Sequence, residues 1–245
     1  MAVSWEDEGI VLSVRKFAEH DAIVSVLTEK QGRHVGLVKG GSGKTKRAAL
    51  QAGNVVKAWW RARLEDQLGH YTIEPIHNFA AGVLSDPRAL AGLASLCAMA
   101  EAALPEREAH AEVFRLAMSL LANLGAPGWE AAYVRWELCL LRDMGYGLDL
   151  GSCAATGVTD ELTYVSPRSG RAVSTSAAAP YRDRLLALPP FLADDAQPPT
   201  AVDLVAGLKL TAHFFDVHVF APHHRDIPAA RARFAERLQA DANIS

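Results

Sequence analysis

The first eighty residues contain five short segments in which apolar and polar side chains alternate at every second position. This alternation is typical of β-strands with one buried face and one exposed face. Turns containing glycine separate several of the segments, so neighbouring strands are expected to run antiparallel. The expected strands are residues 9–15, 22–28, 34–39, 55–64 and 71–76.

Five short strands within about eighty residues favour a closed barrel, because closure removes the exposed edges of a small sheet. We therefore predict a five-stranded OB-fold barrel over residues 1–80, with an SH3-like barrel as the alternative. Residues 40–49 contain three glycines and three cations, and we expect them to form a flexible cationic loop between the third and fourth strands.

After Pro87 the period of the apolar pattern changes from two to about 3.6 residues, which indicates helices. Three helices are expected near residues 90–104, 113–124 and 133–144, with Asp86 and Pro87 at the start of the first. The pattern is lost over residues 146–199 and returns near 204–219 and 227–238. We therefore expect an α+β protein with a helical domain at 81–245 and a small irregular insertion at about 146–199.

The charges are distributed unevenly along the chain. Nine cations and no acid lie between Lys30 and Arg63, so this segment is +9 and the rest carries −12, for a net charge of −3. A basic segment of this kind attracts phosphate and indicates nucleic-acid binding, although it could also be a solvated surface. The residues expected to bind DNA are Lys39, Lys44, Lys46, Arg47, Lys57, Trp59, Arg61 and Arg63.

Alternation along the fourth strand places Trp59 on the same face as the cations and Trp60 on the opposite face. An exposed tryptophan between cations suits single-strand binding, because a base stacks on the ring and the cations neutralise its phosphates. The alternative is that Trp59 packs against the helical domain.

Known catalytic and metal-binding patterns are missing or incomplete. The segment Gly40–Thr45 resembles a phosphate-binding loop, but Val38 stands where that motif needs its first glycine. The histidines at 213, 218, 223 and 224 lack the spacing and the companion ligands of a zinc site. We therefore expect no enzyme, no metal and no cofactor.

The three cysteines are expected to be reduced thiols, as in a cytoplasmic protein. The first residues lack the apolar core of a signal peptide, and we expect no apolar run long enough to span a membrane.

The order of several motifs resembles the bacterial recombination mediator family RecO over nearly the whole chain. The resemblance begins with Gly9–Arg15 and Glu19–Thr28 and continues through Leu140–Tyr146. It ends with Tyr164–Pro167, Ser169–Val173, His218–Phe220 and Pro228–Arg231. Each motif is weak alone, and their joint order carries the match.

The resemblance implies an OB-fold, a helical domain and a small zinc-finger-like insertion. It also implies binding of single- and double-stranded DNA, annealing of complementary strands, and DNA repair in the cytoplasm near the nucleoid. The implied partners are RecR, the C-terminal tail of single-stranded DNA-binding protein and, indirectly, RecA, which is loaded at gaps.

The chain departs from zinc-containing members of the family, which carry two Cys-x-x-Cys pairs in the insertion. Here Cys153 stands alone, Thr156 occupies the second position, and residues 170–180 contain no cysteine. We therefore expect an insertion without zinc, in which Cys153 is a small buried apolar residue. Two other functions stay open, an OB-fold RNA-binding factor and a protein–protein adaptor with a basic docking surface.

Overall fold

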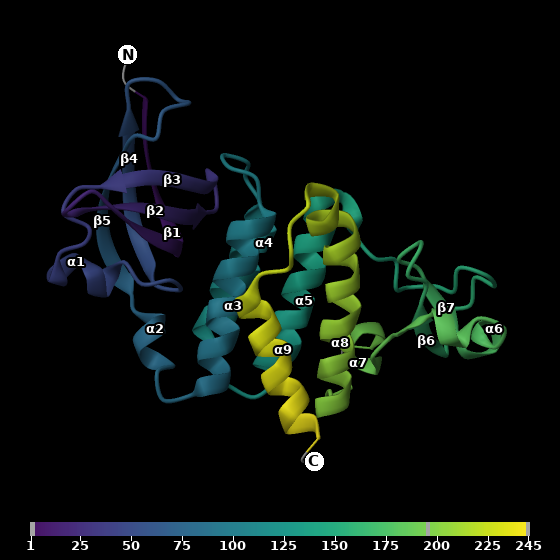
Figure 1. The fold of residues 1–245 in the computed structure, drawn as a ribbon. Coiled ribbons are helices and arrows are strands. Elements are labelled where there is room, and N and C mark those ends of the chain that lie inside the picture. Colours follow the sequence, from purple (N-terminus) through teal and green to yellow (C-terminus); the bar gives the residue numbers. More distant parts are fainter. Residues whose placement is uncertain (1–2, 195–196, 244–245) are drawn as a thin grey trace. The chain divides into compact units, whose positions relative to one another are not determined.

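The computed structural model describes residues 3–194 and 197–243, apart from the side chains of residues 44 and 45. The chain divides into two compact units, Met1–Gly125 and Ala126–Ser245. The first holds a five-stranded barrel followed by helices, and the second is mainly helical with a small sheet (Figure 1). The expected α+β class is confirmed.

The barrel closes in the strand order β1-β2-β3-β5-β4, with β3 and β5 parallel and the other pairs antiparallel. The first strand is long enough to pair with β4 through its first half and with β2 through its second half. This order confirms the OB-fold. The strands are β1 Val3–Phe17, β2 Asp21–Thr28, β3 Gly32–Val38, β4 Val55–Ala62 and β5 His70–His77.

The barrel interior is filled by the inward side chains that alternation predicts. On β4, Val56, Ala58 and Trp60 are buried, while Lys57 and Trp59 are half-buried on the outer face. At Gly36 a Cβ atom would lie 2.5 Å from the ring of Tyr71, so only glycine fits at this point of β3. β1 begins earlier than predicted because residues 3–8, although acidic, pair with β4.

The link between β3 and β4 is more ordered than predicted. Residues 44–49, expected to be flexible loop, form the short helix α1 (Lys44–Ala49). Gly40 adopts φ +64°, which allows the chain to turn sharply after β3. The expectation of a wholly irregular loop was wrong, because Lys46, Arg47, Ala48 and Ala49 favour a helix.

Three further helices, α2 (Phe79–Gly82), α3 (Pro87–Ala103) and α4 (Ala111–Ala122), complete the first unit. Asp86 begins α3 as predicted, since its side chain accepts hydrogen bonds from the amides of Arg88 and Ala89. α3 packs on β1, where the Cys97 Sγ lies 3.8 Å from the carbonyl oxygen of Val11. The compact unit extends through α4, and the predicted domain boundary at residue 80 falls within α2.

In the second unit, α5 (Trp129–Leu141), α8 (Ala201–Phe214) and α9 (Ala229–Ala242) pack together. Glu137 and Arg231 form a buried ion pair at 3.0 Å, and Thr211 donates a hydrogen bond to the same carboxylate. A π-helical turn η1 (Arg142–Tyr146) follows α5, and the turns η3 (Phe215–Phe220) and η4 (Ala221–His223) follow α8.

The insertion is less irregular than predicted. It contains a three-stranded sheet in the order β7-β6-β8 together with short helices. Cys153 is buried beside Val173 and Ala178, and its sulfur accepts a hydrogen bond from the Ser174 amide. The elements are β6 Leu162–Val165, β7 Ala172–Ser174, α6 Thr175–Ala178, η2 Arg182–Arg184, β8 Leu186–Ala187 and α7 Pro190–Ala193.

One helical stretch, Ala201–His223, is long and apolar enough to cross a membrane by length and composition alone. The expectation that no such run exists was therefore too strict. Of its most apolar window, 56% is buried inside the protein, as in the core helix of a folded domain.

Candidate nucleic-acid interface

The structure separates the eight residues predicted to bind DNA into two groups. Lys39, Lys44, Lys46 and Arg47 lie in the link between β3 and β4. Lys57, Trp59 and Arg61 lie on the outer face of β4, and Arg63 follows that strand. The side chain of Lys44 lies outside the described residues. We call the surface around Lys16, Lys39, Lys46 and Arg47 the α1 face, and the surface around Glu6, Lys57, Trp59 and Arg61 the β4 face.

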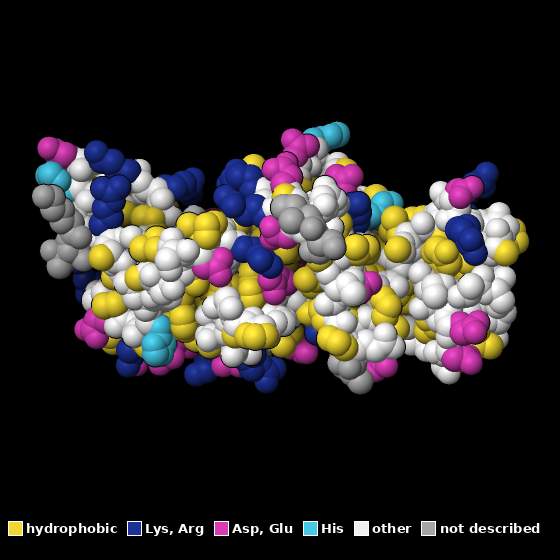
Figure 2. Space-filling view, turned by 90° about the horizontal axis from the view of Figure 1, so that it is seen from below, with side chains coloured by type: hydrophobic (Ala, Val, Ile, Leu, Met, Phe, Trp, Pro, Cys, Tyr) yellow, Lys and Arg dark blue, Asp and Glu magenta, His cyan; other side chains and the backbone are white. Residues whose placement is uncertain are grey.

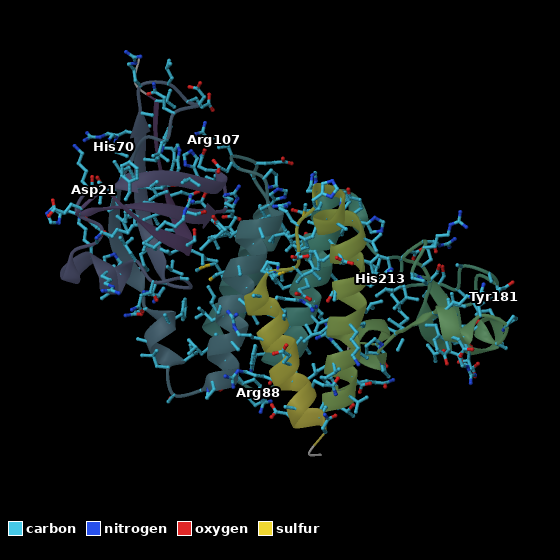
Figure 3. All side chains as sticks on the ribbon, viewed as in Figure 1. Asp21, His70, Arg88, Arg107, Tyr181 and His213 are labelled. Carbon is cyan, nitrogen blue, oxygen red and sulfur yellow. The ribbon has the colours of Figure 1, made fainter. Side chains whose placement is uncertain are left out.

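The α1 face contains a groove of about 670 Å³ between the end of β1, the β1–β2 turn and α1. The glycine-rich link is tied to that turn, because the Gly40 amide donates to the Asp21 carboxylate at 2.8 Å and the Ser42 amide donates to the His20 carbonyl at 2.9 Å. Figure 3 labels Asp21 at this end of the barrel. These hydrogen bonds hold the segment Gly40–Thr45, which resembles a phosphate-binding loop, against the β1–β2 turn, where its glycines line the groove.

Cations line and border this groove. Lys16 and Arg47 are among its lining residues, and Lys46 Nζ donates to the carbonyl oxygen of Lys39 at 2.7 Å. That bond holds an ammonium group beside the groove without neutralising it, since a carbonyl carries no net charge. Figure 2 shows Lys and Arg side chains over the barrel at the left of the view. Glu19 is the acidic lining residue of the groove.

Sequence reasoning missed part of this face because it considered only residues 30–63. Arg15, Lys16 and Phe17 lie at the end of β1, and Phe17 is 46% exposed. Two adjacent cations followed by an exposed aromatic residue, just before a turn, are the signal that could have indicated them.

The β4 face is organised around Glu6 of β1. Lys57 Nζ lies 2.8 Å from one carboxylate oxygen of Glu6, and Trp59 Nε1 donates to the other at 2.7 Å. Lys57 also lies over the ring of Trp59, 5.1 Å from its centroid. These contacts lower the pKa of Glu6, first through the Lys57 hydrogen bond, and the same hydrogen bond raises the pKa of Lys57.

Neighbouring strands bring more acids to the β4 face. Lys57 is paired in register with Glu8 of β1 and with Glu74 of β5. Glu6, Glu8 and Glu74 lie outside residues 30–63 in the sequence, but strand pairing places them beside Lys57, where they offset part of that segment's positive charge. The charge of Arg33 is offset in the same way. Its guanidinium contacts Glu101 and Glu106 and donates a hydrogen bond to the Leu104 carbonyl oxygen.

No group of three or more His, Cys, Asp and Glu side chains that could hold a metal ion occurs within residues 3–194 and 197–243. Two of the four histidines considered for a metal have other contacts. The Nε2 atom of His213 lies 3.2 Å from the Pro167 carbonyl oxygen, and His218 stacks on Tyr146 with ring centroids 4.9 Å apart.

Two family models match this chain. The model described as "Recombination protein O N terminal" matches residues 1–79, and the model described as "Recombination protein O C terminal" matches residues 84–226. The boundary between the two matches falls between the barrel and α3.

Curated relatives named "DNA repair protein RecO" match over nearly their whole length. The protein of Rhodospirillum centenum is 52% identical, covering 97% of this chain and 95% of the relative. That of Rhodospirillum rubrum is 48% identical, covering 97% of both chains. That of Gluconacetobacter diazotrophicus is 46% identical, covering 97% of this chain and 96% of the relative.

Proposed function

Because the chain belongs to the recombination protein O family of DNA repair proteins, we propose that it is a non-enzymatic recombination mediator. It binds single- and double-stranded DNA, anneals complementary strands and helps to load recombinase at gaps covered by single-stranded DNA-binding protein. The observation that carries the DNA-binding part is the groove of the α1 face, with Lys16 and Arg47 in its lining and Lys46 beside it.

Phosphate neutralisation supplies the binding energy in this proposal. Lysine and arginine side chains displace the counterions condensed on DNA, and the released ions make binding favourable and dependent on salt. This contact ignores base sequence, as a mediator acting at any gap requires. On the α1 face the cations Lys39, Lys46 and Arg47 are exposed and accessible to a phosphate backbone.

Annealing follows from the same electrostatics. Two complementary strands repel one another through their phosphates, and a protein surface that neutralises both lowers this repulsion. No covalent bond is made or broken in the process, so it needs no catalytic group and no cofactor. The partners that we propose are RecR, the C-terminal tail of single-stranded DNA-binding protein and, indirectly, RecA, and the proposed location is the cytoplasm near the nucleoid.

The test is a titration of the full chain into labelled single-stranded DNA at several salt concentrations, with RNA of equal length as competitor. We expect the affinity for the labelled DNA to fall steeply as salt rises. RNA of equal length should displace the labelled strand less effectively than unlabelled DNA does. Preference for RNA would point instead to an RNA-binding factor. Absence of binding at low salt would make the basic surface a docking site for acidic proteins and overturn the proposal.

A further inference from the structure

The β4 face has its own pocket beside Trp59. It has a volume of about 440 Å³ and is lined by residues 4–6 of β1, residues 59–61 of β4 and Thr72 of β5. This volume falls in the range of roughly 300–1,000 Å³ that is typical of small-ligand sites. The pocket is separate in its lining residues from the groove of the α1 face.

The ring of Trp59 is held in place at one wall of this pocket. Glu6 fixes its Nε1 atom, and Lys57 lies over the ring. Arg61, two residues further along the same outer face of β4, is exposed and also lines the pocket. An oriented aromatic ring with a guanidinium beside it is suited to a flat, unsaturated ligand, which can stack on either group.

The surrounding charges argue against a phosphate as the group that enters. Glu6 is ionised and lies in the pocket, and Glu8 and Glu74 flank Lys57 on the neighbouring strands. These carboxylates offset the positive charges of Lys57 and Arg61, so the face does not attract a phosphate strongly. A nucleobase is flat and uncharged, so it can enter without such attraction while its strand's phosphates bind elsewhere.

The carboxylate of Glu6 adds a chemical preference. Each of its two oxygens already accepts one hydrogen bond, and a carboxylate has about four acceptor positions, so about two remain. Guanine carries two adjacent donors on its pairing edge. Thymine carries one N–H between two carbonyl oxygens, and a carboxylate repels those oxygens.

We propose that the pocket beside Trp59 binds one unpaired base of a DNA strand and prefers guanine to thymine, with Glu6 as the residue that determines this preference. The base stacks on Trp59 next to Arg61 and donates hydrogen bonds to the Glu6 carboxylate. This inference rests on the proposed DNA binding and adds a base preference to it.

The experiment compares two labelled strands of equal length, one of thymidines only and one of thymidines with isolated guanosines spaced to prevent guanine pairing. Fluorescence anisotropy at fixed salt gives the affinity of the full chain for each. The guanine-containing strand should bind roughly fivefold tighter, the lower end of what a good side-chain contact to a base edge provides. Glu6→Gln should reduce this ratio to less than about twofold, because the amide replaces one acceptor by a donor.

Glu8→Gln is the matched control, since Glu8 lies on the same strand and face but outside the pocket lining. Both variants remove one negative charge, so both raise the affinity for any strand, and only Glu6→Gln should change the ratio. Trp59→Ala provides a second check, because it should weaken binding of the guanine-containing strand more than binding of the thymidine strand.

The outcomes separate the two proposals. If neither strand binds, the proposed DNA binding fails. If both strands bind the parent chain equally, or if the ratio survives Glu6→Gln or Trp59→Ala, DNA binding stands and the proposed base pocket is wrong.

Discussion

The α1 face and the β4 face lie on one barrel, but their cations have different neighbours. On the α1 face, Lys46 donates to a carbonyl oxygen, so its charge is held in place and not neutralised. On the β4 face, Lys57 lies 2.8 Å from the Glu6 carboxylate and is paired in register with two further acids. The first arrangement attracts a polyanion, whereas the second is locally balanced.

The difference comes from strand pairing. β4 lies between β1 and β5, whose outward side chains are acidic beside Lys57, whereas the link containing α1 lies outside the sheet. A count of charges along the chain treats the cations of the two faces alike, because it ignores the acidic side chains that strand pairing places beside Lys57.

The largest expected effect is a loss of barrel stability in acid, which weakens the support of both faces together. His34 is buried among Trp5, Trp60 and Tyr71, and burial, with a smaller contribution from the charge of Arg107, lowers its pKa to about 4. An unfolded chain binds a proton at His34 near pH 6.5, and the folded chain does not until about pH 4. The free energy of unfolding should therefore fall by about 2 to 3 kcal/mol between these pH values.

Chemical denaturation at a series of pH values measures this loss. His34→Gln stays neutral throughout, so its free energy of unfolding should vary less between pH 6.5 and pH 4 than that of the parent. Equal pH dependence in parent and variant would contradict the burial of an uncharged His34.

The next largest effect should come from reversing charge on the α1 face. Lys46→Glu with Arg47→Glu should weaken single-strand binding at least about tenfold at moderate salt and lower the log–log salt slope by about 1.4, because about 0.7 is lost per phosphate contact. The matched control is Arg233→Glu with Arg237→Glu, which reverses two exposed arginines on α9. If both double variants lose affinity equally, overall charge governs binding and the α1 face has no special part.

Much of the fold could be predicted from periodicity. Alternation identified the five strands and placed Trp60 inside and Trp59 outside, because a pleated strand sends successive side chains to opposite faces. Asp86 before Pro87 was found because its capping chemistry is local in sequence. The helix α1 and the small sheet of the insertion were missed, since such short elements carry too little pattern to separate them from loops.

The candidate site was only partly accessible to sequence reasoning. Lys39, Lys46 and Arg47 could be proposed because they are close together along the chain. Lys16 was missed because it joins them only through the β1–β2 hairpin, and the Glu6 partner of Trp59 is 53 residues away in sequence. Contacts of this range depend on register, which a single sequence does not specify.

A single-charge comparison sharpens the contrast between the faces. Lys16→Gln removes a cation from the groove of the α1 face and should lower the salt slope of single-strand binding by about 0.7. Lys57→Gln removes a cation whose charge Glu6 already offsets, and should change the slope by less than half of that. Titration of both variants over the same salt series measures the two slopes. The contrast fails if Lys57→Gln has the larger effect.

The smallest effect concerns the balance within the β4 face. Hydrogen bonds from Lys57 and then Trp59 hold the pKa of Glu6 below its usual range, so removing either donor should raise it, more in Lys57→Gln than in Trp59→Phe. NMR titration of the Glu6 carboxyl in the parent and the two variants measures the order. The pKa of Glu6 should be lowest in the parent, because a carboxylate that accepts two hydrogen bonds is protonated only at lower pH. An identical pKa in all three proteins would mean that Glu6 engages neither partner, and the β4 face would then carry free cations as the α1 face does.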